Sequence, residues 1–244
     1  MSAEPQRMSF ETLPPSVLGA RARSSARNRR AWSRIGLAIA DAGPRLRRAI
    51  DITGAGFGLL LIAPVLIAAA IAIKVTSRGP LLFRQERIGK DGRRFAMLKL
   101  RTMRIDAEAQ KDALIQAAGT QPEGGVVRFK SKTDPRITRV GRALRKLSID
   151  ELPQLLNVVM GDMTLVGPRP AVWREVKDYD PRALRRLEVA QGLTCLWQIG
   201  GRSDLTFEQQ VELDIEYIDR TRPLDEVKIV AKTVPAVITG RGAY

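Results

Sequence analysis

The first third of the chain contains one long stretch of apolar residues. No charged residue occurs between Ile52 and Ile73, a run of 22 residues. A straight helix of that length rises about 33 Å, close to the thickness of the hydrocarbon core of a bilayer. The run starts too late for a signal peptide, lacks a convincing cleavage site and is followed by further basic residues. The pattern therefore predicts a membrane segment, and an ordinary transmembrane helix is its simplest form.

Two features of this segment favour a hairpin that enters and leaves on one face of the membrane. Pro64, near the middle of the run, removes a helix hydrogen bond and favours a kink. Basic residues, which favour the cytoplasmic side, flank both ends of the run: Arg45, Arg47 and Arg48 before it, and Lys74, Arg78, Arg84 and Arg87 after it. Residues 45–78 are therefore predicted to form a re-entrant helix–break–helix.

The remainder of the chain alternates between short elements. Apolar runs at 81–83 and 95–98 flank the turn residues Lys90-Asp91-Gly92 and predict a β-hairpin over residues 81–101. Helices are expected at 106–118, 134–146, 148–160, 204–219 and 224–238, and a rigid turn is expected around the prolines at 168 and 170. The last helix is amphipathic and suits either the bilayer surface or the catalytic core.

These elements define an α+β fold dominated by helices. We expect residues 79–244 to form a small cytoplasmic catalytic domain with the β-hairpin and amphipathic interfacial helices. Residues 1–44 are rich in Arg, Ser, Pro and Ala and show little periodicity, so they are expected to be a mostly disordered basic arm. The length of 244 residues fits one catalytic domain with a short appendage.

Composition limits the chemistry that the chain can perform. Histidine is absent, which excludes Ser–His and Cys–His catalysis and metals held by His. A single cysteine, Cys195, excludes an internal disulfide and any zinc or iron–sulfur site that needs several cysteines. Catalytic groups must therefore come from carboxylates, hydroxyls, Lys, Arg or Tyr.

The net charge of +15 is concentrated in one part of the chain. Residues 76–146 carry 18 basic and 7 acidic side chains, whereas residues 147–244 carry 12 basic and 15 acidic ones. A basic block directly after an apolar segment suits anionic headgroups, a phosphorylated ligand or nucleic acid. A solvated, solubilising face is the simpler interpretation of such a block.

The acidic pair Asp150-Glu151 is the strongest candidate for chemistry. Ser148 and Glu151 fit a capping box, in which case the two acids would only complement a helix dipole. Basic residues on both sides favour a diphosphate site instead: Lys99, Arg101, Arg142, Arg145, Lys146 and Arg169. Positive charges would keep Asp150 ionised and able to attack an electrophilic phosphorus. Adjacent carboxylates also suit Mg²⁺.

Several motifs follow one another in an order and spacing that are specific together. They are Ser77–Gly89, Lys99–Met103, Thr133–Thr138, Leu147–Leu156, Gly161–Met163, Gly167–Pro170, Gly192–Thr194 and Trp197–Arg202. Through them, about residues 45–244 of the chain resemble the bacterial sugar transferase family. These are monotopic polyprenyl-phosphate hexose-1-phosphate transferases that start exopolysaccharide and glycan assembly, and the last five residues, Gly240–Tyr244, resemble the exopolysaccharide subgroup.

The resemblance implies a reaction and roles for individual residues. Asp150 would attack the β-phosphate of a UDP-sugar and release UMP, and undecaprenyl phosphate would then take the phosphosugar from the aspartate. Glu151 would be its partner, holding Mg²⁺ or activating the acceptor. Lys99, Arg145 and Arg169 would hold phosphates, as would Arg101 unless it is a surface charge, and Asp214 matches an acidic family position of less certain role. The enzyme would sit on the cytoplasmic face of the bacterial inner membrane.

Two residues depart from the family pattern. Ala63 stands where Ser commonly precedes the hairpin proline, which makes the bend geometry less secure. Gln191 stands where Pro is common, and Cys195 and Trp197 are interpreted as packing residues. The alternatives are an inactive membrane-anchored scaffold of a polysaccharide assembly complex, which has no need of the acidic pair, and a nucleic-acid-binding protein, which the apolar segment and the lack of a motif oppose. The sugar is left open, and so is a homo-oligomer.

Overall fold

The computed structural model describes residues 34–105, 107, 110, 134–200, 205–220 and 223–239. The chain divides into two compact units, Met1–Pro44 and Arg45–Tyr244. Most of the first unit, including the predicted basic arm, lies outside the described residues, as does the helix expected at 106–118. The second unit contains every predicted site residue.

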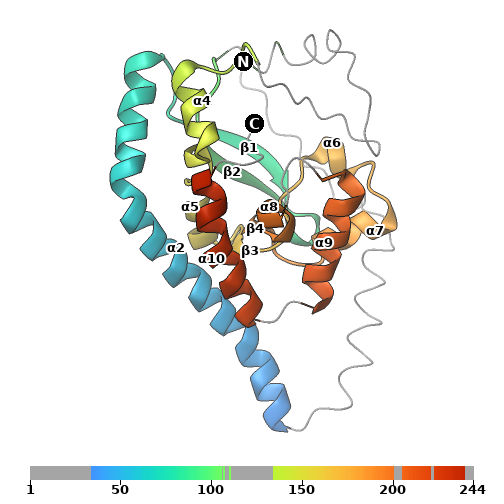
Figure 1. Cartoon of the computed structure of the whole chain (residues 1–244). Coiled ribbons are helices and arrows are strands. Elements are labelled where there is room, and N and C mark those ends of the chain that lie inside the picture. The colour runs from blue at the N-terminus through green and yellow to red at the C-terminus, as the bar shows by residue number, and fades with distance from the viewer. Residues whose placement is uncertain are drawn as a thin grey trace, which may run out of the picture. The chain divides into compact units, whose positions relative to one another are not determined.

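The apolar segment forms one helix without a break, α2 (Arg34–Thr76), which bends along its length in Figure 1. The predicted break at Pro64 is therefore wrong. A proline removes one backbone hydrogen bond, but α2 packs on the rest of the unit on both sides of it. Leu59 and Ile62 contact one core cluster, and Leu66 and Ala69 contact another. These contacts attach the helix to the rest of the unit on both sides of Pro64.

The other face of α2 is apolar and exposed. Phe57, Leu60, Leu61, Val65, Ile67, Ile71 and Val75 are all exposed large hydrophobic residues. Among the described residues, the stretch Gly43–Thr76 is the only helix long and apolar enough to cross a membrane. An exposed apolar stripe of this length is compatible with membrane anchoring.

Polar contacts at the start of the apolar run attach α2 to the rest of the second unit. The buried carboxylate of Asp51 accepts hydrogen bonds from Thr164 Oγ1 at 2.7 Å and from the Leu165 amide at 2.9 Å. Arg47 donates to the Val166 carbonyl at 3.0 Å and pairs with Glu226 at 2.9 Å. Arg47 was predicted only as part of the basic flank and Asp51 was not singled out, whereas here both attach the helix to the rest of the unit.

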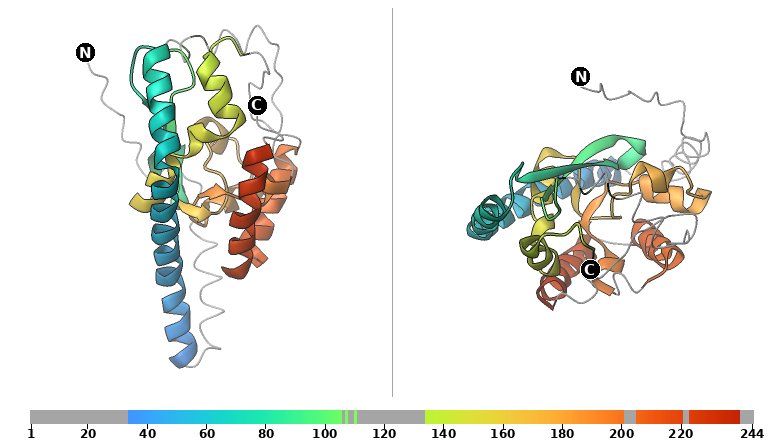
Figure 2. Two further views of the ribbon diagram at one scale, coloured as in Figure 1. Left: turned by 60° about the vertical axis from the view of Figure 1, so that its left-hand side comes forward. Right: turned by 90° about the horizontal axis from the view of Figure 1, so that it is seen from above.

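The predicted β-hairpin is confirmed. Strands β1 (Leu82–Ile88) and β2 (Arg94–Leu100) pair antiparallel, with Leu82 opposite Leu100 and Ile88 opposite Arg94. The turn is the 3₁₀ segment η2 (Lys90–Gly92), in which Asp91 and Gly92 have φ values of 55° and 77°. Asp and Gly are residues that tolerate this left-handed region. Figure 2 shows the hairpin between α2 and the α6–α7 segment.

A second, parallel pair of strands was not predicted. Strands β3 (Thr164–Val166) and β4 (Gly192–Thr194) have three residues each. Between them run α6 (Trp173–Val176), α7 (Pro181–Leu184) and η4 (Arg185–Leu187). The strands meet at a close backbone contact, since a Cβ on Gly192 would lie 2.1 Å from the Gly167 nitrogen. Only glycine fits at this position. The close approach of the two backbones, and not a pattern of apolar residues, is therefore the feature that distinguishes the second short strand.

The remaining helices surround these strands. Helix α4 (Arg139–Lys146) begins later than predicted, at a Thr138 side chain that accepts a hydrogen bond from the Gly141 amide. It is followed by η3 (Ile149–Glu151), α5 (Gln154–Met160) and α8 (Leu196–Gly200). The two C-terminal helices, α9 (Phe207–Arg220) and α10 (Pro223–Thr239), agree with the predicted ranges to within three residues. The fold is α+β and dominated by helices, as expected.

Candidate active site

Asp150 and Glu151 lie on a single 3₁₀ turn, η3, and not at the start of a long helix. Ser148 precedes the turn in the left-handed region, with φ 53° and ψ 21°, and its side chain makes no capping hydrogen bond. Pro153 separates the turn from α5. The predicted capping box and the continuous helix over 148–160 are both wrong. A serine in this conformation costs about 1 kcal/mol or more, and such strain is commonly found at functional sites.

Glu151 is held by two cations. Lys99 Nζ lies 3.0 Å from Glu151 Oε1, and the Arg169 guanidinium grips both oxygens, at 2.5 Å and 3.2 Å. Burial raises the pKa of the Glu151 carboxyl, but Arg169 and Lys99 outweigh burial and hold that pKa well below its usual range. Glu151 is therefore a fixed carboxylate that organises the cations around it.

Asp150 is the opposite case. The residue is only 6% exposed, and no described residue donates a hydrogen bond to its carboxylate. Burial raises the pKa of Asp150, and the neighbouring Glu151 raises it further. Lys99, Arg145 and Arg169 lower this pKa, but by less, so the prediction that nearby cations lower it overall is wrong. The environment thus separates the roles of the two carboxyls, leaving Asp150 without a partner.

The three predicted phosphate ligands Lys99, Arg145 and Arg169 come from different elements but meet at the acidic pair. Lys99 is on β2, and burial lowers its pKa even though Glu151 opposes this. Arg145 is in the last turn of α4, where its Nε donates to Thr102 Oγ1 at 2.9 Å. Arg169 follows β3 in the Gly-Pro-Arg-Pro turn.

One buried residue that sequence reasoning missed fixes the acidic pair against β2. Asn157 of α5 is completely buried. Its Oδ1 accepts from the Leu98 amide at 2.9 Å, and its Nδ2 donates to the Ala96 carbonyl at 2.8 Å. These bonds attach the helix that follows the dyad to the strand that carries Lys99. Nothing in the sequence marks this asparagine, because an Asn on a short helix usually faces solvent.

The two other predicted site residues lie away from the dyad. Arg101 donates to the Ser77 carbonyl at 3.0 Å and to Ser77 Oγ at 2.8 Å, immediately after the end of α2. Asp214 is completely buried on α9, where it accepts from Arg186 Nε at 2.8 Å. Burial raises the pKa of Asp214 to about 6, against the opposing effects of Arg186 and the Trp197 indole.

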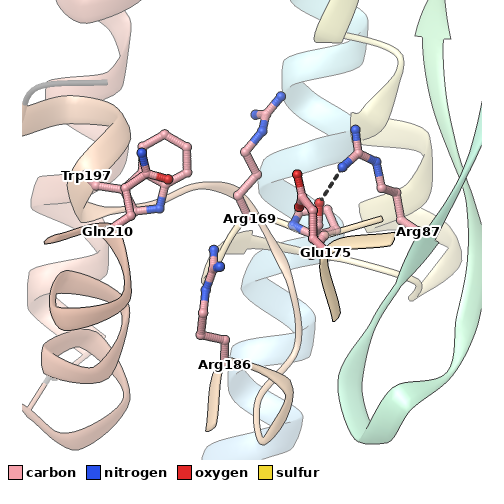
Figure 3. A pocket seen from close by; sticks show the side chains of 8 residues that line it. Arg87, Arg169, Glu175, Arg186, Trp197 and Gln210 are labelled. Carbon is pink, nitrogen blue, oxygen red and sulfur yellow. Dashed lines mark hydrogen bonds between the residues drawn. The ribbon is translucent and has the colours of Figure 1, made fainter. Parts of the chain in front are cut away.

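A cavity of about 190 Å³, shown in Figure 3, is lined in part by Arg169, the partner of Glu151. Arg169 connects the cavity to the acidic pair. Its guanidinium donates hydrogen bonds to Glu151, and its side chain lines the cavity. The other polar side chains of the lining are Arg87, Glu175, Arg186, Trp197 and Gln210. Arg87 was assigned to the membrane flank and Trp197 to packing, and the rest were not singled out. They come from five elements, so only the folded chain brings them together.

The described residues contain no cluster of three or more His, Cys, Asp or Glu side chains that would hold a metal ion by themselves. Within the part of the chain that the structure describes, the acidic pair would have to share a cation with oxygens of a ligand. This arrangement is typical of Mg²⁺, which takes few protein carboxylates and shares its shell with phosphates and water.

Comparisons with known proteins identify the family. Residues 43–240 match the family model for bacterial sugar transferases. The chain is 44% identical to galactosyl transferase CpsE of Streptococcus agalactiae, over 81% of this chain but 43% of CpsE. It is 38% identical to exopolysaccharide production protein ExoY of Rhizobium meliloti, over 85% of this chain and 92% of ExoY.

A third relative is the UDP-glucose:undecaprenyl-phosphate glucose-1-phosphate transferase of Caulobacter vibrioides. It is 41% identical over 81% of this chain and 72% of the relative. The chain thus spans less than half of CpsE but nearly all of ExoY. With the family model matching most of its length, the chain belongs to the bacterial sugar transferase family.

Proposed function

We propose that this protein transfers a hexose-1-phosphate from a UDP-sugar to undecaprenyl phosphate, giving undecaprenyl-diphosphate-sugar and UMP. This is the initiating step of exopolysaccharide or glycan synthesis, and it is the reaction named for the Caulobacter relative. One observation carries the proposal. Asp150 is a buried carboxylate without a hydrogen-bond donor among the described residues, and it lies beside a second carboxylate that is firmly paired with Lys99 and Arg169.

In the first half-reaction, Asp150 is the nucleophile. One of its oxygens forms a bond to the β-phosphorus of the UDP-sugar, and the bond from that phosphorus to the oxygen bridging the two phosphates breaks. UMP leaves with the bonding electrons, and a phosphosugar remains on Asp150. Lys99, Arg145 and Arg169 bind the phosphate oxygens and stabilise the charge that develops on them. A carboxylate with no hydrogen bond is more nucleophilic than one held by cations, which favours Asp150 over Glu151.

In the second half-reaction, an oxygen of undecaprenyl phosphate bonds to the same phosphorus and the Asp150 carboxylate leaves. The free enzyme is restored, and the phosphosugar now ends a polyprenyl diphosphate. Glu151 keeps Lys99 and Arg169 in position through both steps, because its two oxygens hold both cations. We assign it to this positioning role.

The acidic pair fits Mg²⁺. Asp150 has oxygens that no described residue uses, and the diphosphate would supply further ligands. Bound there, the ion would neutralise charge on the diphosphate and its leaving group. Removal of divalent ions with EDTA is expected to abolish UMP release, and added Mg²⁺ is expected to restore it. Full activity in EDTA would contradict the assignment of Mg²⁺.

The lipid acceptor requires the catalytic unit to lie at a membrane. Between Asp51 and Ile73, one face of α2 packs on that unit, so this helix cannot cross a bilayer alone while the packing holds. We propose that α2 anchors the protein through its exposed apolar face, with the catalytic unit on the cytoplasmic side of the inner membrane. Single cysteines placed at Ser2 and near the C-terminus should both be labelled only from the cytoplasm. Labelling from opposite sides would contradict this arrangement.

The activity is tested by measuring UMP release from a panel of UDP-sugars, with detergent-purified protein, Mg²⁺ and undecaprenyl phosphate. Wild type should release UMP with at least one sugar, and Asp150→Asn should release none. Asp178→Asn, which changes an exposed aspartate on the same unit, is the control and should keep full activity. Activity of folded Asp150→Asn would contradict the mechanism, and an inactive wild type would contradict the function.

A further inference from the structure

Gln154 is a buried polar residue that the reaction as written so far does not use. It is the first residue of α5 and is only 1% exposed. Its Nε2 is buried and has no hydrogen-bond partner in the part of the chain that the structure describes. Burial of an unpaired amide costs free energy, and nearly all buried polar groups in folded proteins have a partner. An unpaired amide this close to a reaction centre points to a partner that forms during the reaction.

The position of Gln154 along the chain directs its side chain toward the acidic pair. It lies four residues after Asp150, and the two residues before it, Leu152 and Pro153, have right-handed helical backbone angles. On a helical backbone, residues four apart share one face, their Cβ atoms lie about 5–6 Å apart, and their side chains lean toward the N-terminus. The side chain of Gln154 is therefore expected to extend back over the turn that carries Asp150.

The next residues on this face of α5 show that it is turned toward β2. Asn157 and Val158, about one turn after Gln154, are completely buried. Asn157 Oδ1 accepts from the Leu98 amide of β2 at 2.9 Å, and Val158 packs in a core cluster with a methionine of the same strand. The residue after Leu98 is Lys99, one of the two cations paired with Glu151. Gln154 thus belongs to the face that meets the strand of the active site.

Asp150 lacks the kind of partner that Gln154 offers. No described residue donates to its carboxylate, and the cations Lys99 and Arg169 are paired with Glu151. Once one oxygen of Asp150 bonds to phosphorus, the other becomes a carbonyl oxygen, which accepts hydrogen bonds. An amide donates to such an oxygen without drawing the cations away from Glu151. Gln and Asp side chains one helical turn apart can form this hydrogen bond.

We propose that Gln154 is a positioning residue for Asp150. In the phosphosugar–aspartate, Gln154 Nε2 donates to the Asp150 carbonyl oxygen that is not bonded to phosphorus. This hydrogen bond fixes the acyl group, so that the phosphorus faces the departing UMP in the first half-reaction and the lipid phosphate in the second. No covalent bond forms or breaks at Gln154. The inference rests on the proposed transfer of the phosphosugar through Asp150.

The test is the kinetics of Gln154→Met in the full-length, detergent-purified protein. Methionine keeps an unbranched side chain of similar length and removes the donor. We expect kcat for UMP release to fall at least tenfold while KM for the UDP-sugar stays unchanged, because the hydrogen bond is made only as the phosphorus joins Asp150. Formation of the hexose phosphate adduct in a single turnover, followed by rapid quenching and intact-protein mass spectrometry, should slow by the same factor.

Thermal melting separates positioning from a structural role. Replacing an unpaired buried amide by an apolar side chain of similar shape is neutral or stabilising, so Gln154→Met should melt at or above the wild-type temperature. Gln191 is the matched control, since it is also 1% exposed but its Nε2 donates to the carbonyls of Arg186 and Val189 at 2.8 Å and 3.1 Å. Gln191→Met should melt about 2 °C or more below wild type and keep its kcat.

Three results for Gln154→Met would overturn the proposal. They are a wild-type kcat, a raised KM with kcat unchanged, and a fall of both kcat and melting temperature, which would make the amide structural. If wild type releases UMP and Gln154→Met does so equally fast, the proposed function stands and only the role of Gln154 falls. If wild type releases no UMP from any UDP-sugar, both fall.

Discussion

Two arginine–carboxylate pairs stand near the same cavity and differ in almost everything else. In the first pair, the side chains of Glu151 and Arg169 are 23% and 24% exposed, and Lys99 is a second cation bound to Glu151. In the second pair, the side chains of Asp214 and Arg186 are 1% and 4% exposed, and one carboxylate binds one guanidinium. Beside the first pair lies Asp150, whose carboxylate receives no hydrogen bond from any residue that the structure describes. The second pair is enclosed, with Arg186 also donating to the Tyr179 hydroxyl at 3.0 Å and lying over the rings of Tyr179 and Phe207.

The difference shows that an ion pair by itself does not mark an active site. The Glu151 pair has a second cation and is partly exposed, whereas the Asp214 pair has one cation and is almost completely buried. Asp214 was predicted to bind substrate. Its position fits a residue that orients Arg186 in the wall of the cavity, and variants can separate these two roles.

Of the residues in these two pairs, Arg169 is expected to have the largest effect on catalysis. Arg169→Lys keeps the charge but loses the fork that grips both oxygens of Glu151. We expect kcat/KM for the UDP-sugar to fall roughly 100-fold, about 2.7 kcal/mol of transition-state stabilisation. The control is Arg185→Lys, which removes a similar two-bond contact, to Asp219 at 2.6 Å and 3.2 Å, from the surface. Equal losses in the two variants would contradict the comparison.

Asp214 should affect stability more than chemistry. Asp214→Ala leaves Arg186 buried without its partner, so we expect the free energy of unfolding to fall by about 3–5 kcal/mol. Glu212→Gln, at an exposed pair with Arg182, should change it by less than about 0.5 kcal/mol. Denaturant unfolding in detergent measures both. A stable Asp214→Ala that fails to bind the UDP-sugar would restore the predicted substrate role.

Asp214→Asn should be milder than Asp214→Ala. Burial raises the pKa of Asp214 to about 6, so the folded protein accommodates the neutral side chain. The folded state then binds this proton more tightly than the unfolded state does, and the stability from this group is present at low pH and lost as pH rises from about 4 to about 6. Asp214→Asn should lack that slope. An identical pH dependence in both proteins would contradict the raised pKa.

The pH dependence of catalysis should follow Asp150. Burial and Glu151 raise the pKa of Asp150, and the protonated form cannot attack phosphorus. The acidic limb of UMP release in a single turnover without acceptor should therefore lie above the pKa of an ordinary aspartate. Asp214→Asn is the control, because that group also titrates above the usual range. A limb that disappears in Asp214→Asn would assign it to Asp214 instead.

The smallest effect is expected where α2 attaches to the catalytic unit. Thr164→Val removes one of the hydrogen bonds to the buried Asp51 carboxylate, and we expect a loss of about 1–2 kcal/mol of stability. Thr53→Val removes a bond from an exposed threonine on α2 to the Ala49 carbonyl and should have little effect. Thermal melting in detergent compares the two. No difference between them would mean that Asp51 does not fix α2.

Local patterns in the sequence were sufficient to predict part of this fold and part of the candidate site. The β-hairpin followed from apolar runs around Lys90-Asp91-Gly92, because its turn residues tolerate the left-handed region. The acidic pair and its cations Lys99, Arg145 and Arg169 followed from residue type and family resemblance. The hairpin and the acidic pair could be predicted because the residues that define them are recognised by type, even when the ends of the surrounding elements are misplaced by a few residues.

Other features depended on contacts between distant parts of the chain. Pro64 was expected to break α2, but the helix continues through it and packs on the rest of the unit on both sides. Ser148 was expected to cap a helix, but the chain turns there through a left-handed conformation. Two three-residue strands are too short to show a pattern, and the cavity collects side chains from elements up to 123 positions apart, from Arg87 to Gln210. Tertiary packing decides such features, and local propensity does not.

The central claim is that Asp150 carries the phosphosugar between the two substrates. Intact-protein mass spectrometry after incubation with the preferred UDP-sugar, without undecaprenyl phosphate, tests it most directly. The account predicts an adduct with the mass of a hexose phosphate, located on Asp150 by peptide mapping, absent from Asp150→Asn and lost when undecaprenyl phosphate is added. An adduct that persists in Asp150→Asn, or turnover by wild type with no adduct under rapid quenching, would contradict it.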